Sequence, residues 1–274
     1  MFGKRTDLYS NRMREKRKSS LKKKFTLSLI TFFTFFGGGV YLLNQDRFLI
    51  HTIVVEGVET LPSEEIKTKT NELLTGKELL LIPHKSAFFY PKKNLLASLK
   101  EAFPKISSVS VKVEGFNTLY VIISERKPAA VLCGNAGEKA CVFVDADGFA
   151  FANAPDFSGS VFLEYNASGT ENMILGEQAI LPEEFRPLQF FAEELRKSGF
   201  PLKRIVFLDE SQSEGYFTGG GKILFDRKTG LNDAWTSFET LVSSNALDKV
   251  KNASGGFTVQ YIDLRNGNKI YYKP

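Results

Sequence analysis

The distribution of apolar residues divides the chain near its N-terminus. A polar, basic stretch gives way to residues 25–43, which contain no charged side chain. A helix of that length rises about 28 Å, close to the roughly 30 Å hydrocarbon core of a bilayer. The pattern therefore predicts a transmembrane helix at residues 25–43, preceded by a basic tail at residues 1–24.

The next segment, residues 48–126, changes between the periods of strands and helices. Residues 50–58 are rich in β-branched side chains and read as a strand. A helix is expected from Ser63, where two acidic residues follow and suit the positive end of the helix dipole, and a second near residues 92–103. Apolar alternation then predicts one strand around Val109, Val111 and Val113 and another at residues 118–125. The predicted order is β-α-α-β-β.

The remaining chain, residues 127–274, combines short strand patterns with two amphipathic helices. The predicted helices cover residues 182–198 and about 232–246, and predicted strands include residues 204–208, 216–218, 222–225, 261–265 and 269–273. Three consecutive glycines, residues 219–221, supply the turn between two of these strands. The expected fold is α+β, a mostly antiparallel sheet with covering helices.

The distribution of charge predicts the orientation of the transmembrane helix in the membrane. The tail at residues 1–24 has ten Lys/Arg and two acidic residues and is therefore +8, while the whole chain is +5. The rest is therefore −3, so nucleic-acid binding by the folded part is not expected. The positive-inside rule places the N-terminus in the cytoplasm and the folded part outside. A cleaved signal peptide is the alternative, but no small-x-small site follows Leu43.

The two cysteines fit an extracytoplasmic location. Cys133 and Cys141 flank a loop containing Gly and Asn, between two predicted strands. This spacing predicts a cross-strand disulfide, with two unrelated buried thiols as the alternative. A zinc site is not expected, because His51 and His84 are isolated in the sequence.

Three weak catalytic patterns are better explained by structure. Ser124 and Lys127 have the Ser-x-x-Lys spacing but lead out of a strand rather than into a helix. Asp145 and Asp147 belong to a DADG turn, and the glycine run lacks the Lys-Ser/Thr of a phosphate-binding loop. We therefore expect no enzymatic activity and no cofactor.

Three motifs, in order, carry a resemblance to a known family. The run FPKISSVSVKVEGFNTLYVIISERKPAAVL resembles the end of the POTRA domain in the FtsQ/DivIB family of bacterial division proteins. CVFVDADGFAF and GFTVQYIDLRNGNKIYYKP resemble the hairpin that opens the family's second domain and the strand pair that closes it. The residues that match the first motif are Pro104, Val109, Val111, Thr118, Leu119, Glu125, Arg126, Pro128 and Ala130.

The resemblance implies a POTRA domain at residues 48–126 and a β-rich domain at residues 127–274. It also implies a non-enzymatic, single-pass scaffold of the divisome in the plasma (inner) membrane at the division septum. Its partners would be FtsB/DivIC-like and FtsL-like coiled-coil membrane proteins, linked to the septal peptidoglycan synthase complex. The alternatives are another POTRA-bearing membrane protein that assists polypeptide transport or assembly, and a signal-anchored cell-wall hydrolase.

The resemblance places the partner site on the IDLR motif and the strand that follows it. That strand is expected at a sheet edge, where unpaired main-chain groups can receive a partner strand. The chain departs from better-known family members by having Asn rather than an aromatic residue after Arg265, and two nearby tyrosines are the candidate substitutes. An ordinary hairpin with solvated tyrosines is the alternative. The candidate site residues are Arg265, Asn266, Asn268, Lys269, Ile270, Tyr271 and Tyr272.

Overall fold

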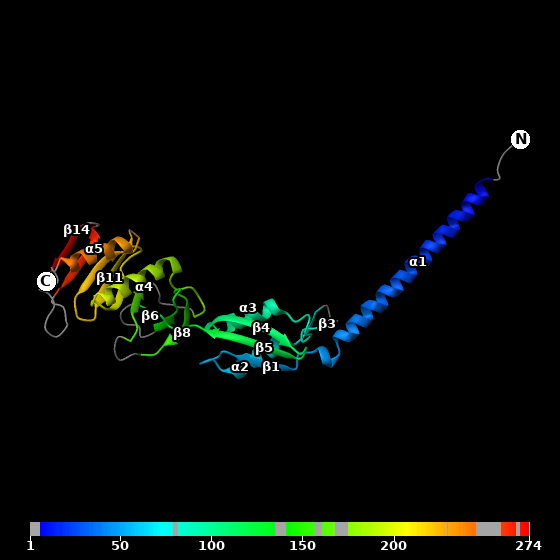
Figure 1. The fold of residues 1–274 in the computed structure, drawn as a ribbon, viewed down its shortest axis with the longest axis horizontal. Helices are drawn as coiled ribbons and strands as arrows, with labels where there is room; N and C mark the ends of the chain where they lie inside the picture. The colour runs from blue at the N-terminus through cyan, green and yellow to red at the C-terminus, as the bar shows by residue number, and fades with distance from the viewer. Residues whose placement is uncertain are drawn as a thin grey trace. The chain divides into compact units, whose positions relative to one another are not determined.

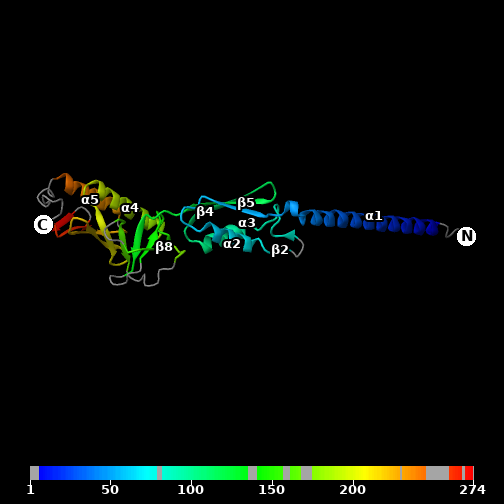
Figure 2. The same ribbon diagram turned by 90° about the horizontal axis from the view of Figure 1, so that it is seen from below.

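A computed structural model describes most of the chain (Figures 1 and 2). The described ranges are residues 6–78, 82–134, 141–156, 161–167, 175–228, 230–244, 259–266 and 269–273, with side chains from residue 22 onward except at residue 167. They form two compact units: Met1–Leu99 with Val109–Ile123, and Lys100–Ser108 with Ser124–Pro274. Residues 100–108 and 124–126, which the sequence assigned to the first domain, therefore group with the second unit.

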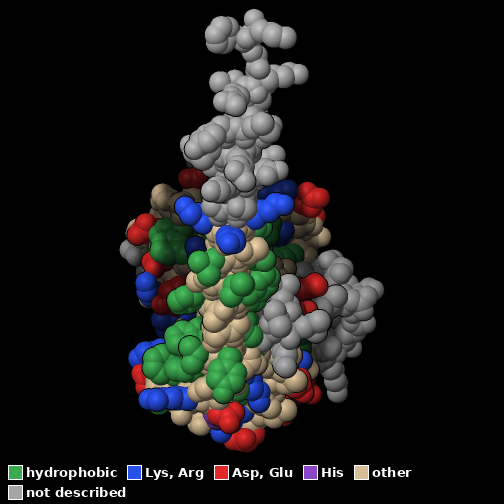
Figure 3. Space-filling view, turned by 90° about the vertical axis from the view of Figure 1, so that its right-hand side faces the viewer, with side chains coloured by type: hydrophobic (Ala, Val, Ile, Leu, Met, Phe, Trp, Pro, Cys, Tyr) green, Lys and Arg blue, Asp and Glu red, His purple; other side chains and the backbone are tan. Residues whose placement is uncertain are grey.

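The first helix, α1 (Thr6–Leu43), is longer than the apolar run that predicted it and continues through most of the basic tail. Within α1, Lys22–Leu43 is long and apolar enough to cross a membrane. The hydroxyls of Thr26, Thr31 and Thr34 donate to carbonyls one turn back, at 2.8–3.0 Å. These polar groups are thus satisfied inside the helix, as a lipid environment requires. In space-filling view the apolar stretch lies below a collar of basic side chains (Figure 3).

The rest of the first unit is a three-stranded sheet with two helices. A 3₁₀ turn, η1 (Asp46–Phe48), leads into β1 (Thr52–Glu56), α2 (Ser63–Leu73), β2 (Lys77–Glu78), β3 (Ile82–Pro83), α3 (Lys92–Ala102), β4 (Ile106–Glu114) and β5 (Thr118–Glu125). The strand order is β1-β5-β4, with β1 parallel to β5. The main elements follow the predicted β-α-α-β-β order. The short β2–β3 ladder was not predicted, because each strand has only two residues.

Helical spacing explains the core of this unit. Ile66 of α2 and both Leu95 and Leu99 of α3 are completely buried. Leu119 and Val121 of β5 are also completely buried and alternate with half-buried or exposed neighbours, as a strand's inward-facing side chains do.

The second unit is built on a nine-stranded sheet. Its strands are β6 (Ala130–Cys133), β7 (Cys141–Val144), β8 (Ala150–Ala154), β9 (Glu164–Ala167), β10 (Leu202–Phe207), β11 (Gln212–Phe217), β12 (Lys222–Asp226), β13 (Tyr261–Asn266) and β14 (Lys269–Lys273). Their order is β14-β13-β12-β11-β10-β9-β6-β7-β8. Most pairs are antiparallel, as expected, but β9 pairs parallel with both neighbours and β12 pairs parallel with β13.

Two helices, α4 (Pro182–Lys197) and α5 (Leu231–Ser243), cover one face of this sheet (Figure 2). The predicted apolar stripe of α4 is buried, including Phe185, Leu188 and Phe191. Phe238 of α5 packs edge-on against Phe200, with ring centroids 5.2 Å apart. Along β11 and β12, buried residues alternate with half-buried ones, whereas β6 is buried throughout. The five α-helices and the large sheet give the expected mixed fold.

The cross-strand disulfide expected from the cysteine spacing is present in the structure. Cys133 of β6 lies opposite Cys141 of β7 in the antiparallel register, and their sulfurs are 2.01 Å apart. The bond closes a short loop and so removes conformations from the unfolded chain, which contributes about 2–3 kcal/mol in the chain-entropy model.

Candidate interaction surface

The strand β14 lies at one edge of the nine-stranded sheet. It pairs with β13 on one side, and no strand of the described ranges pairs with its other side. Tyr271 and Tyr272 of this strand are both exposed, as is Lys269. An exposed edge presents a row of main-chain donors and acceptors to which an extended segment can add.

The structure separates the predicted site residues by the face on which they lie. Ile262 and Leu264 of β13 are buried on the helix-covered face, and the register pairs Ile262 with Tyr272. Asp263 pairs with Tyr271 on the opposite, polar face. Ile270 is half-buried and packs against the core, so only part of its side chain is available to a partner. Asn266 is exposed at the end of β13, and Asn268 lies outside the described residues.

Arg265 is held in place on the same face of the sheet as Asp263. Its Nε and Nη2 donate to the two carboxylate oxygens of Asp263, at 2.9 and 2.7 Å, and its Nη1 donates to the side-chain oxygen of Gln212, at 2.9 Å. Hydrogen bonding from Arg265 lowers the pKa of Asp263 below its ordinary value of 3.8. The guanidinium is therefore oriented before any partner arrives, which reduces the entropy lost on binding.

A second charged group lies beside it on β11 and β12. Glu214 accepts from Lys222 Nζ at 2.6 Å and from the Tyr216 hydroxyl at 2.7 Å. Burial alone would raise the pKa of Glu214, but these hydrogen bonds and the positive charges of Lys222 and Arg265 outweigh it, so the pKa is lowered. The guanidinium of Arg204 lies 5.2 Å from the Tyr216 ring centre.

We call this set the polar face. It consists of Gln212, Glu214, Tyr216, Lys222, Asp263 and Arg265, next to Tyr271 of the edge strand. The sequence identified only Arg265 of the six. The others depend on how β11, β12 and β13 align, and the sequence QSEGYF of β11 has no alternation of polar and apolar residue types that would have identified Gln212 and Glu214 as strand residues.

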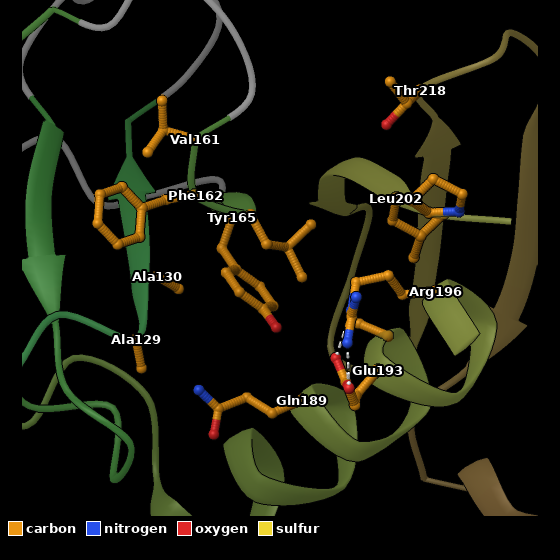
Figure 4. Close-up of a pocket in the computed structure, with 13 residues that line it drawn as sticks. Ala129, Ala130, Val161, Phe162, Tyr165, Gln189, Glu193, Arg196, Leu202 and Thr218 are labelled. Atoms are coloured by element: carbon orange, nitrogen blue, oxygen red, sulfur yellow. Dashed lines mark hydrogen bonds and ion pairs between the residues drawn. The ribbon is translucent and has the colours of Figure 1, made fainter. Parts of the chain in front are cut away.

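A separate cavity of about 560 Å³ lies beside α4 in the second unit (Figure 4). Apolar side chains, including Phe162 and Leu202, form much of its wall, and Gln189 and Arg196 approach from α4. The Tyr165 hydroxyl points into it, fully buried and without a hydrogen-bond partner in the described part of the chain. Burial strongly raises the pKa of this hydroxyl, so it stays protonated. Arg196 is paired with Glu193 at 2.7 Å, so the cavity has little net charge.

The two aspartates of the DADG turn make hydrogen bonds and ion pairs within the fold. Asp145 accepts hydrogen bonds from the main-chain N–H groups of Asp147 and Phe149, as a turn carboxylate does, and pairs with Arg126. Asp147 pairs with Arg186 at 2.6 Å. Within the residues that the structure describes, no group of three or more His, Cys, Asp or Glu side chains is placed to hold a metal ion.

Comparison with known proteins gives no further guide to the function of this surface. No known family model matches the sequence, and no curated protein matches it.

Proposed function

We propose that the chain is a membrane-anchored, non-enzymatic scaffold that binds an extended partner segment along β14. The observation that carries the proposal is the open edge of β14 next to the polar face, on which Arg265 is already oriented. Main-chain hydrogen bonds to the edge supply affinity, while side chains beside it select the partner.

The chemistry of the surface favours a partner with an acidic residue. Asp263 binds one edge of the Arg265 guanidinium. The part of the guanidinium that stays exposed can also bind a carboxylate of a partner. The two exposed tyrosines offer apolar area with a hydroxyl at its rim, a combination frequent in binding hot spots. Binding should weaken as salt concentration rises, because such a contact is partly exposed to solvent.

The motif resemblance supports a more specific version of this proposal. In it, residues 48–126 form a POTRA domain, and the partners are FtsB/DivIC-like and FtsL-like coiled-coil membrane proteins. The chain would hold them at the division septum of the plasma membrane and link them to septal peptidoglycan synthesis. The N-terminus would lie in the cytoplasm, and the domains that follow α1 would lie outside it.

Site-specific photo-crosslinking tests the proposal. A photoreactive amino acid at Tyr271 should crosslink to small coiled-coil membrane proteins. The same amino acid at Phe190 is the matched control, because both side chains are 52 % exposed and Phe190 lies on α4. Equal crosslinking at the two positions would contradict a specific edge site. Release of peptidoglycan fragments by the purified chain would contradict the non-enzymatic role.

Adjacent proline substitutions test the main-chain contact. Along an antiparallel edge strand, successive N–H groups point alternately inward and outward. Of Tyr271→Pro and Tyr272→Pro, one should therefore damage the sheet and the other should remove only an outward N–H. The variant that keeps the fold, judged by circular dichroism, should lose partner binding. If it binds like the unmodified chain, strand addition is the wrong mechanism.

A further inference from the structure

Three phenylalanines form a partly exposed cluster in the first unit, and one of them, Phe48, lies close in sequence to the end of α1. The ring centroids of Phe48, Phe88 and Phe116 are 5.4–5.9 Å apart. Phe88 is 54 % exposed and Phe116 is 49 % exposed, and the neighbouring Phe89 is exposed as well. We call Phe48, Phe88, Phe89 and Phe116 the aromatic cluster. A patch of this kind on a folded surface marks a contact with an apolar environment.

Main-chain hydrogen bonds hold the cluster against the segment that leaves α1. The N–H of Ala87 donates to the carbonyl of Phe48 at 2.9 Å, and that of Ile50 donates to Lys85 at 2.7 Å. The N–H of His51 donates to Asn117, at 2.9 Å, which fixes the turn that carries Phe116. Three separate chain segments therefore meet immediately after the anchor.

The turn between β4 and β5 places an aromatic residue where the backbone disfavours one. Phe116 has φ +65°, and it is the single described non-glycine residue with a positive φ. Asn or Gly adopts this conformation more easily than a bulky side chain. The structure accepts this strain at an exposed position, where Phe116 adds little to the core. This points to a use for the ring outside the fold.

We propose that the aromatic cluster inserts into the interfacial layer of the bilayer that α1 spans; this rests on the membrane anchoring in the proposed function. Only four residues lie between Leu43 and Phe48, so Phe48 is at most about 18 Å from Leu43 along the chain. The helix α1 also contacts β3, which directly precedes the segment bearing Phe88. The membrane interface adds about 5–8 Å to each side of the hydrocarbon core, so the cluster is within reach of it.

The charge around the cluster fits a lipid surface. Lys85, Lys92 and Lys93 lie within five residues of Phe88, and Lys92 and Lys93 are exposed. Basic side chains beside aromatic ones suit an interface in which rings lie at headgroup level and cations meet lipid phosphates. In the space-filling view, hydrophobic side chains gather both along α1 and near its lower end (Figure 3). Such contacts would restrict how the first unit tilts on its anchor.

Depth-dependent fluorescence quenching tests this inference. The full chain with Trp235→Phe, which removes the single native tryptophan, would be placed in nanodiscs of lipids brominated near the headgroup. In that background, Phe88→Trp should show quenched, blue-shifted emission. The matched control is Ile122→Trp, because Ile122 is also an exposed hydrophobic residue of the first unit. It lies on β5 about 13 Å from Thr118, the residue at which β5 begins after the turn that carries Phe116. This control should remain unquenched.

A third reporter separates the inference from the anchoring on which it rests. Phe33→Trp, within α1, should be quenched by lipids brominated deep in the acyl chains. If Phe33→Trp is quenched and Phe88→Trp is not, the chain is anchored but the aromatic cluster does not enter the membrane, which overturns the inference. If neither is quenched, anchoring itself fails and the inference falls with it.

The strained residue offers a second, independent measurement. Phe116→Asn should preserve or raise the melting temperature, because Asn relieves the backbone strain. The same change should reduce the quenching of Phe88→Trp, because one ring of the cluster is lost. Unchanged quenching would overturn a role for Phe116 in lipid contact. Crosslinking at Tyr271 should be unaffected in either case, since that site belongs to the other unit.

Discussion

Two arginine–aspartate pairs in the second unit serve different purposes. Arg126 pairs with Asp145, 19 residues away, and the side chains are only 18 % and 12 % exposed. Its Nε also donates to the carbonyl of Pro104, and its guanidinium lies 3.9 Å from the Phe149 ring centre. Arg265 pairs with Asp263 two residues away on the same strand, and Arg265 is 32 % exposed.

The comparison shows that a motif arginine is not by itself a binding residue. All the visible partners of Arg126 belong to the fold, so it ties the chain entering β6 to the turn between β7 and β8. Arg265 is oriented by its partners but still faces solvent. The first pair therefore stabilises the unit, and the second presents charge.

The largest effect should come from removing the buried pair. Arg126→Ala should lower the free energy of unfolding by about 3–5 kcal/mol, because it leaves a buried carboxylate without its partner. Arg265→Ala should cost about 1 kcal/mol or less, since its pair is partly exposed. Urea unfolding of the two purified variants measures both values. Among folded proteins, Arg265→Ala should reduce crosslinking to the partner more than Arg126→Ala does. Equal losses of stability would contradict the different roles of the two pairs.

Near each of the two ion pairs, the chain contains a position at which only glycine fits. A Cβ at Gly148 would lie 2.3 Å from the carbonyl oxygen of Ile180, and a Cβ at Gly221 would lie 2.1 Å from that of Val259. Both have positive φ, so Ala should cost about 2–4 kcal/mol through backbone strain and displacement of a neighbour. Gly199 also has positive φ, but no described atom lies within 4 Å of its Cβ. Gly199→Ala should therefore cost only about 1 kcal/mol, and thermal unfolding of the three variants would show whether crowding or φ dominates.

Low pH should remove the stabilisation that the Asp263–Arg265 pair of the polar face contributes. The pKa of Asp263 is lowered by hydrogen bonding from Arg265, so its folded value lies below its unfolded value. The resulting stabilisation is present above the unfolded pKa and is lost as the pH falls through the folded pKa. Arg265→Gln should move the Asp263 titration upward toward 3.8, the ordinary value. Carbon-detected NMR of the carboxyl group measures the midpoint, and an unchanged midpoint would show that the pair does not form in solution.

The smallest changes in stability should come from removing either of two tyrosine hydroxyls. Tyr165→Phe removes a buried hydroxyl that has no partner among the described residues, so stability should stay constant or rise by up to about 1 kcal/mol. Tyr216→Phe removes a hydroxyl that donates to Glu214, and should cost about 0.5–1.5 kcal/mol. Equilibrium unfolding distinguishes the two. A clear loss at Tyr165 would mean that the cavity supplies a hydrogen bond, for example through water.

Elements with strong local patterns were predictable from the sequence. The amphipathic stripe and matched end charges of α4 determined its bounds to within one residue, and the strands of the terminal hairpin were also found. The strand β9 was missed because its four residues show no clear alternation. The continuation of α1 into the basic tail was missed although Lys, Arg, Glu and Leu, all good helix formers, were present.

The candidate site was only partly predictable, for a physical reason. Arg265, Tyr271 and Tyr272 belong to one short stretch of sequence, and the motif and the terminal hairpin locate them. Gln212 reaches Arg265 across 53 positions, through the pairing of β11, β12 and β13. Sheet register of this kind depends on tertiary packing rather than on any local pattern. The partial burial of Ile270, likewise, follows from which face of β14 meets the core.

The position of β9 has a consequence for folding kinetics. The β6–β8 and β10–β12 strands can each form from neighbouring hairpins, whose short loops close within microseconds. The four residues of β9 then join these two groups through parallel pairings, Val131 with Glu164 on one side and Arg204 with Glu164 on the other. Both require closure of long loops, as does the parallel pairing of β12 with β13, so we expect these three contacts to form late. The two hairpin groups are therefore expected to form before β9 joins them and before β13 and β14 extend the sheet.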